Sequence, residues 1–125
     1  MKKDQHYYVI TVEVGEGIKA SGVPRSEIFI TSKVWCTYHR RVEENLDKIL
    51  EALGTDYVDL LLVHWPFAMN PNGNHPLFPS KEDGTRDMDD EWDISDTWKQ
   101  MEAVQRSGNC GVGTMAVRLR NFACS

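Results

Sequence analysis

Between residues 28 and 63 the sequence places one amphipathic helix pattern between two short apolar runs. The runs are residues 28–31 and 58–63, and neither alternates regularly between apolar and polar side chains. Runs of this kind are typical of parallel strands buried on both faces. Apolar residues recur at helical spacing over residues 40–53, and Gly54 follows where a helix commonly ends. This order predicts a βαβ unit with a parallel pair of strands.

The length sets a limit on this fold. A chain of 125 residues is long enough for one domain. It is too short for a complete (β/α)8 barrel, which needs about 250 residues. We therefore expect a single α/β domain that is smaller than such a barrel.

Charge and cysteine content limit which kinds of partner the protein is expected to bind and in which cellular compartment it is expected to lie. The chain has 14 Lys and Arg against 19 Asp and Glu, a net charge of −5 that argues against a nucleic-acid partner. No stretch approaches the roughly 20 apolar residues of a membrane span, so no membrane partner is expected. The 3 cysteines form no CxxC pair, which predicts no disulfide framework, no metal site and a reducing, cytoplasmic location.

Two more helices are predicted outside the βαβ unit. A short one falls within residues 12–20, and a longer one begins near Asp93 or Ser95 and ends at Gly108. The ends, residues 1–11 and 109–125, have no clear periodicity.

The segment between the second strand and the last helix is a long loop, residues 66–92, which contains four prolines. Loops of this length are usually functional lids or disordered. An acidic run crosses its end: Asp87, Asp89, Asp90, Glu91, Asp93 and Asp96. This run lacks the pattern of a calcium-binding loop. We expect a solvated segment whose last carboxylates favour the N-terminus of the following helix.

Two side chains stand out at the ends of the predicted strands. Lys33 comes directly after the first strand and His64 directly after the second. Catalytic groups of parallel α/β folds collect at that edge, where a Lys and a His could together act on one substrate oxygen. Trp35 and Trp65 would then wall the site. From the residues alone there is an alternative: Lys33 is a solvated lysine at the end of a strand, and His64 is a half-buried histidine with a structural role.

Longer segments carry a resemblance to a known family. Residues 27–39 resemble the third strand and following loop of the aldo-keto reductases, and residues 53–66 resemble their fourth strand. Residues 13–20 and 96–102 are similar to helices of that family, and residues 69–79 to a loop of its fungal glycerol dehydrogenase and glyceraldehyde reductase branch. The similarity covers about residues 12–108. It implies a partial (β/α)8 (TIM) barrel, about the third and fourth βα units with a preceding helix, in one incomplete domain over residues 1–125.

The resemblance implies a chemistry as well. In this family a nicotinamide cofactor, usually NADPH, delivers hydride to a carbonyl carbon while a tyrosine protonates the oxygen. A lysine lowers the pKa of the tyrosine, and a histidine orients the carbonyl. Lys33 and His64 match these two residues, and Trp35 and Trp65 match the pocket walls. The implied function is an NADP(H)-dependent oxidoreductase that interconverts an aldehyde or ketone with its alcohol, on glyceraldehyde- or glycerol-like substrates.

The ends of the chain match the family less closely. Tyr8 stands at the spacing of the catalytic tyrosine before Gly15, while Asp4 lies one position from that of the aspartate that holds the lysine. The family's Ser-Asn-aromatic motif for the nicotinamide is not found after Gly108, where Arg120–Phe122 is a partial echo. The cofactor-binding residues are therefore unknown.

Two other functions stay open. One is a truncated, catalytically incompetent fragment or interaction module, which would self-associate through the open edges of its sheet. The other is an enzyme that forms a Schiff base through Lys33.

Overall fold

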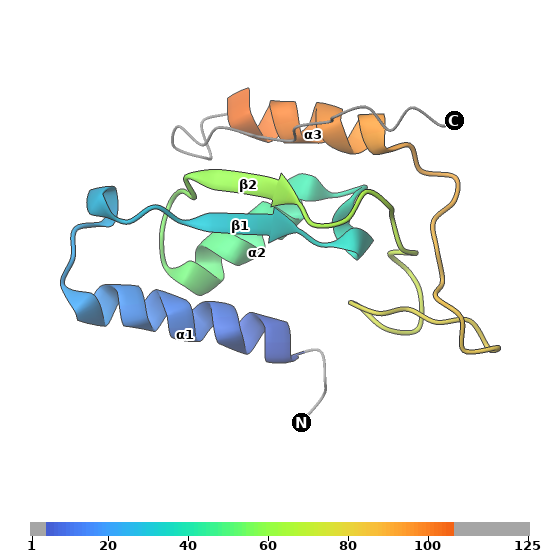
Figure 1. The fold of residues 1–125 in the computed structure, drawn as a ribbon, viewed down its shortest axis with the longest axis horizontal. Helices are drawn as coiled ribbons and strands as arrows, with labels where there is room; N and C mark the ends of the chain where they lie inside the picture. Colours follow the sequence, from blue (N-terminus) through green and yellow to red (C-terminus); the bar gives the residue numbers. More distant parts are fainter. Residues whose placement is uncertain (1–4, 107–125) are drawn as a thin grey trace, which may run out of the picture.

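The computed structural model of the protein describes the backbone of residues 5–106 and the side chains of residues 11–106. Figure 1 shows a two-stranded sheet with one helix below it, one behind it and one above it. In chain order the elements are α1 (Gln5–Ser21), η1 (Arg25–Glu27), β1 (Thr31–Val34), η2 (Cys36–Tyr38), α2 (Val42–Leu53), β2 (Leu60–Val63) and α3 (Ile94–Arg106). Within this part of the chain, no helix has the length and apolar character needed to cross a membrane.

The predicted βαβ unit is confirmed. β1 and β2 are parallel neighbours, with Thr31 opposite Leu60 and Val34 opposite Val63. Helix α2 connects them and lies behind the sheet in Figure 1. Gly54 ends α2 at a φ of 65°, a left-handed conformation that glycine adopts without strain.

The first strand begins later than the sequence predicts, at Thr31 and not at residue 28. Its pairing starts where the Ile30 carbonyl accepts hydrogen bonds from the backbone N–H groups of Asp59 (2.9 Å) and Leu60 (3.1 Å). The apolar pattern therefore predicts a strand that starts too early. Residues 28–30 are apolar but precede the paired region, whereas residues 31–34, most of them polar, form the pairing with β2.

The two strands are buried on one face only in the described part of the chain, which corrects the prediction of burial on both faces. Ile30, Val34 and Leu61 are buried beneath the helices. On the opposite face Phe29 is 71% exposed and Lys33 is also exposed. Side chains of a strand alternate between faces, so a run that is apolar in sequence still divides between a covered and an open side.

Helix α2 forms the centre of the packing. Its Val42 and Leu46 are fully buried and Ile49 is 3% exposed. They pack in one cluster with strand residues and with Met101 and Val104 of α3. Burial of this apolar stripe fixes α2 against the sheet and against α3.

Helix α1 is longer than the predicted segment, residues 12–20, and begins at Gln5. Residues 5–11, for which the sequence gives no clear periodicity, are therefore helical. Gly15 is buried against the end of α2, where an added Cβ would lie 2.5 Å from the carbonyl oxygen of Leu53. Glycine disfavours a helix interior, but at position 15 its missing side chain allows close contact between the two helices.

Arg25 and Asp59 join the N-terminal ends of the two strands. One carboxylate oxygen of Asp59 accepts hydrogen bonds from the Ile30 backbone N–H (2.7 Å) and from Arg25 Nη2 (2.9 Å). These two donors, the backbone N–H first, hold the pKa of Asp59 below its usual value. The C-terminal ends of the two strands lie at the opposite end of the sheet, where the predicted site residues are found.

Candidate active site

Lys33 and His64 lie at the C-terminal edge of the sheet. Lys33 is inside β1, opposite Leu62, and not directly after the strand as predicted, because β1 begins late. His64 follows β2, and its backbone N–H donates to the carbonyl of Val34 (3.1 Å). Residues two apart in a strand point to the same face, so His64 shares the face of Leu62 and Lys33. That face is the open one.

The imidazole of His64 is electrostatically tuned for the neutral form. Burial lowers its pKa below the ordinary value, and the positive charge of Lys33 lowers it further. A neutral imidazole keeps one N–H donor. The ring nitrogens of His64 form no hydrogen bond with another residue in the described range, so this donor is available to a ligand.

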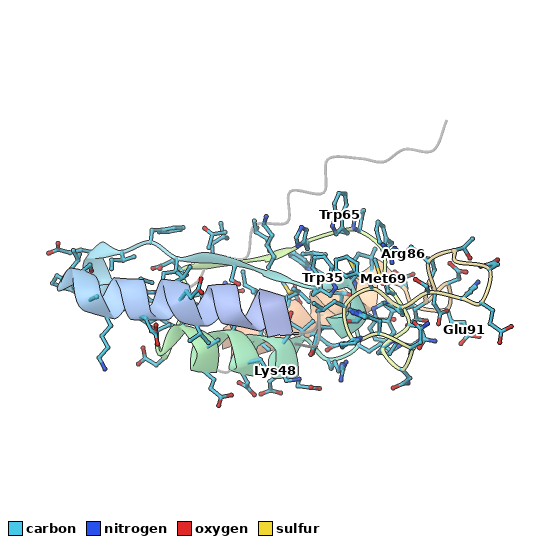
Figure 2. All side chains as sticks on the ribbon, turned by 90° about the horizontal axis from the view of Figure 1, so that it is seen from below. Trp35, Lys48, Trp65, Met69, Arg86 and Glu91 are labelled. Atoms are coloured by element: carbon cyan, nitrogen blue, oxygen red, sulfur yellow. The ribbon has the colours of Figure 1, made fainter. Side chains whose placement is uncertain are left out.

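Aromatic rings surround His64. The Trp35 ring meets it edge-on, with centroids 4.9 Å apart, and the Trp65 ring stacks on it at 5.7 Å. Phe78 contacts Trp35 edge-on at 5.2 Å, and Phe67 stacks on Trp65 at 5.9 Å. We call Trp35, His64, Trp65, Phe67 and Phe78 the aromatic cluster. Figure 2 shows the two labelled tryptophans near the middle of the molecule, with Trp65 projecting outward.

Trp35 is fixed from two sides. Its backbone N–H donates to the side-chain oxygen of Asn45 on α2 (3.0 Å), and its indole N–H donates to the carbonyl of Leu77 in the long loop (2.7 Å). Trp35 is 9% exposed and Asn45 is 3% exposed. The ring that flanks His64 is thus positioned by both the helix and the loop.

The long loop packs over the end of β1. Met69 donates its backbone N–H to the carbonyl of Cys36 (3.0 Å), and the Thr37 hydroxyl donates to the carbonyl of Pro76 (2.7 Å). An isolated antiparallel bridge joins Met69 and Met88. These contacts show an ordered loop and not a disordered one, and a function as a lid stays a prediction.

The acidic run at the end of this loop forms hydrogen bonds and ion pairs within the protein. Asp89 accepts from Arg40 Nε at 2.6 Å, and Asp93 accepts the Ser95 backbone N–H at 2.7 Å near the start of α3. This backbone donor is the main cause that lowers the pKa of Asp93. The described residues include no group of His, Cys, Asp and Glu side chains that could hold a metal ion.

His39 is a buried histidine at the end of η2. Its Nδ1 lies 2.9 Å from the hydroxyl of Thr97, which also accepts the indole N–H of Trp92 (2.8 Å). Burial lowers the pKa of His39, while the backbone of Trp65 and the carboxylate of Asp89 act in the opposite direction. Through the Thr97 hydroxyl His39 is linked to α3 and to Trp92, while its Nε2 is buried without a hydrogen-bond partner among the described residues.

We expect the protein to lose stability as the pH falls from about 7 to about 5, because of His39. The unfolded chain binds a proton at the ordinary histidine pKa, whereas the folded chain, with its lowered pKa, does not. Acid therefore favours unfolding until the folded state is protonated as well. Urea unfolding at several pH values tests this, and His39→Gln should flatten the dependence more than His64→Gln. Equal slopes in the wild type and His39→Gln would contradict the assignment.

The remaining predicted site residues are not placed by the structure. The backbone of Tyr8 belongs to α1, but its side chain lies outside the described residues. Asp4, Gly108 and Arg120–Phe122 also lie outside them. The structure therefore brings together Lys33 and His64 with their aromatic neighbours, and leaves the tyrosine as a prediction.

A parallel βαβ unit with polar side chains at the C-terminal ends of its strands is typical of α/β enzymes, whose active sites lie at those strand ends. A sequence model described as "Aldo/keto reductase family" matches residues 10–115. The chain belongs to the aldo/keto reductase family.

Two curated relatives share about half of the aligned residues with this chain. The chain is 50% identical over 114 residues to a D-galacturonate reductase of Hypocrea jecorina, and 44% identical over 116 residues to a glycerol 2-dehydrogenase (NADP(+)) of Saccharomyces cerevisiae. Each match covers 89% of this chain and 36% of the relative. The chain thus spans about a third of the length of these relatives.

Solved structures agree on the fold. An aldose reductase from Giardia lamblia superimposes with a TM-score of 0.76 at 30% sequence identity, over 88% of this chain and 38% of the other. The protein is thus part of a (β/α)8 barrel, as predicted, and the open face of the sheet corresponds to the interior of such a barrel.

Proposed function

We propose that this chain contributes the lysine and histidine of an NADP(H)-dependent oxidoreductase that interconverts a polyhydroxylated aldehyde or ketone with its alcohol. The observation that carries the proposal is the position of Lys33 and His64 on one open face at the C-terminal edge of two paired strands. The names of the relatives, which include a D/L-glyceraldehyde reductase, support the substrate class.

In this proposal His64 holds the substrate carbonyl. Its neutral imidazole donates a hydrogen bond to the carbonyl oxygen, which polarises the C=O bond. Lys33 adds a positive charge on the same face, which favours negative charge as it develops on that oxygen. It would also lower the pKa of a nearby phenol, the role that the resemblance gives to Tyr8.

A nicotinamide, when bound, would supply the hydride. The described residues form an open wall and not an enclosed cradle for such a group, since Lys33 is exposed and Trp65 is 48% exposed. We therefore assign no residue of this chain to the cofactor. The chain's own contribution is to bind and polarise the carbonyl.

Titration of the 125-residue chain with NADPH, followed by cofactor fluorescence, tests the activity of this chain. Binding should change the fluorescence, and added D-glyceraldehyde should then oxidise the cofactor. If NADPH up to millimolar concentration produces no fluorescence change, catalysis by this chain is ruled out, while its family membership stands.

An interaction module is a second candidate. The two-stranded sheet of the described residues has an unpaired edge on each strand, and Phe29 on its open face is 71% exposed. Unpaired edges and exposed apolar faces favour association. Sedimentation analysis distinguishes the two candidates: a species of 14.3 kDa at all concentrations argues against self-association.

A further inference from the structure

Arg86 is held at the rim of the aromatic cluster. An isolated antiparallel bridge pairs it with Ser80, and its Nη1 lies 3.3 Å from the hydroxyl of Ser80 and 3.4 Å from the carbonyl oxygen of Phe78. Its guanidinium carbon stands 5.2 Å from the centre of the Phe78 ring. The side chain is therefore restrained by the loop, although it is exposed.

The charge of Arg86 is not neutralised by the protein. It forms no ion pair with any carboxylate of the described residues. The neighbouring acids have other partners: Asp83 accepts from Thr85, and Asp87 accepts from the side chain of Asn70 at 2.8 Å. A positioned guanidinium with free N–H groups is suited to a planar carboxylate, which it can bind with two parallel hydrogen bonds.

Ring contacts connect Arg86 to His64. Phe78, under the guanidinium, touches Trp35, and Trp35 touches His64. In Figure 2, Arg86 lies beyond Trp35 and Trp65, in the direction of the loop that carries Glu91. A ligand with its carbonyl at His64 could thus extend past the exposed Phe78 ring toward Arg86, and a chain of several hydroxylated carbons reaches further in that direction than a three-carbon one.

We propose that Arg86 and Phe78 form a subsite for a carboxylate at the far end of the substrate, so that the preferred substrate is an acidic sugar. The carbonyl end binds at His64, the hydroxylated carbons lie along the aromatic cluster, and the carboxylate pairs with Arg86. This inference rests on the proposed function, because it places the carbonyl at His64.

The test measures binding of D-galacturonate and of the neutral D-galactose to the 125-residue chain, by NMR of the tryptophan indole and histidine ring signals. The wild type should bind the acid more tightly, by about fivefold, which is the size of one exposed ion pair. Arg86→Gln should remove this difference and leave binding of the neutral sugar unchanged. Lys81→Gln, which removes another exposed cation of the same loop, should preserve the difference.

Three outcomes would overturn the proposal in distinguishable ways. If both sugars perturb His64 and Trp65 equally and Arg86→Gln changes nothing, the carboxylate subsite is wrong and the proposed function stands. If Lys81→Gln abolishes the preference as fully as Arg86→Gln, the preference reflects general charge and not a subsite. If neither sugar perturbs His64 or Trp65, the proposed carbonyl site fails and the subsite with it.

Discussion

Gly15→Ala should destabilise the protein by about 1–3 kcal/mol, the cost of overpacking a close contact. An added Cβ would stand 2.5 Å from the carbonyl oxygen of Leu53 and 2.9 Å from that of Ala52. These are backbone atoms at the end of α2, so they cannot move aside as a side chain can. Helix α1 would have to shift away from α2.

Gly17→Ala is the matched control. It lies in the same helix, two residues further on, and an added Cβ would meet nothing within 4 Å. Alanine there should stabilise the protein, by up to about 1 kcal/mol, because it favours the helix. Urea unfolding monitored by circular dichroism gives both values. If the two alanines change the free energy of unfolding by the same amount, the close contact between α1 and α2 is wrong.

The sequence predicted the βαβ unit because its signals are local and independent. The helical spacing through Leu46 and Ile49 and the glycine at position 54 each fix one feature of α2. The start of β1 was misplaced because apolar character does not specify pairing, which depends on the distant Asp59 and Leu60. Elements defined by their own periodicity were predictable, and those defined by contact with other segments were not.

The same division holds for the site. The position of His64 after its strand follows from the order of strand and helix. The restraint of Trp35 by Asn45 and Leu77 does not, because it needs contacts across 10 and 42 residues of sequence. Phe78 and Arg86 were missed for this reason too. The length of the loop was the one signal that pointed to them, since long loops in compact domains are often functional.

The largest effect on activity is expected at His64. If the proposed function holds, His64→Ala should lower kcat for reduction of D-glyceraldehyde by about 10²–10³-fold, the loss found when one hydrogen-bond donor to a developing oxyanion is removed. The pKa of His64 is lowered, so the wild-type donor is the neutral imidazole. His64→Gln retains an N–H donor and should recover part of the loss.

Lys33→Met should give a different signature. Loss of the cation removes one of the causes that lower the pKa of His64, so that pKa should rise toward its ordinary value. A phenol that protonates the substrate would also titrate at higher pH without the lysine, so the alkaline limb of the pH–rate profile should move upward. Lys81→Met, an exposed lysine of the long loop, should leave the profile unchanged.

These measurements separate catalysis from structure. A merely structural role of Lys33 would lower the amount of folded protein without moving the pH profile or the His64 pKa, both of which NMR and steady-state rates report for the folded fraction. If Lys33→Met leaves both unchanged, Lys33 is a solvated lysine at the end of a strand, and the electrostatic pairing of Lys33 with His64 is refuted. If both shift, the open face of this sheet carries the polar half of a carbonyl site.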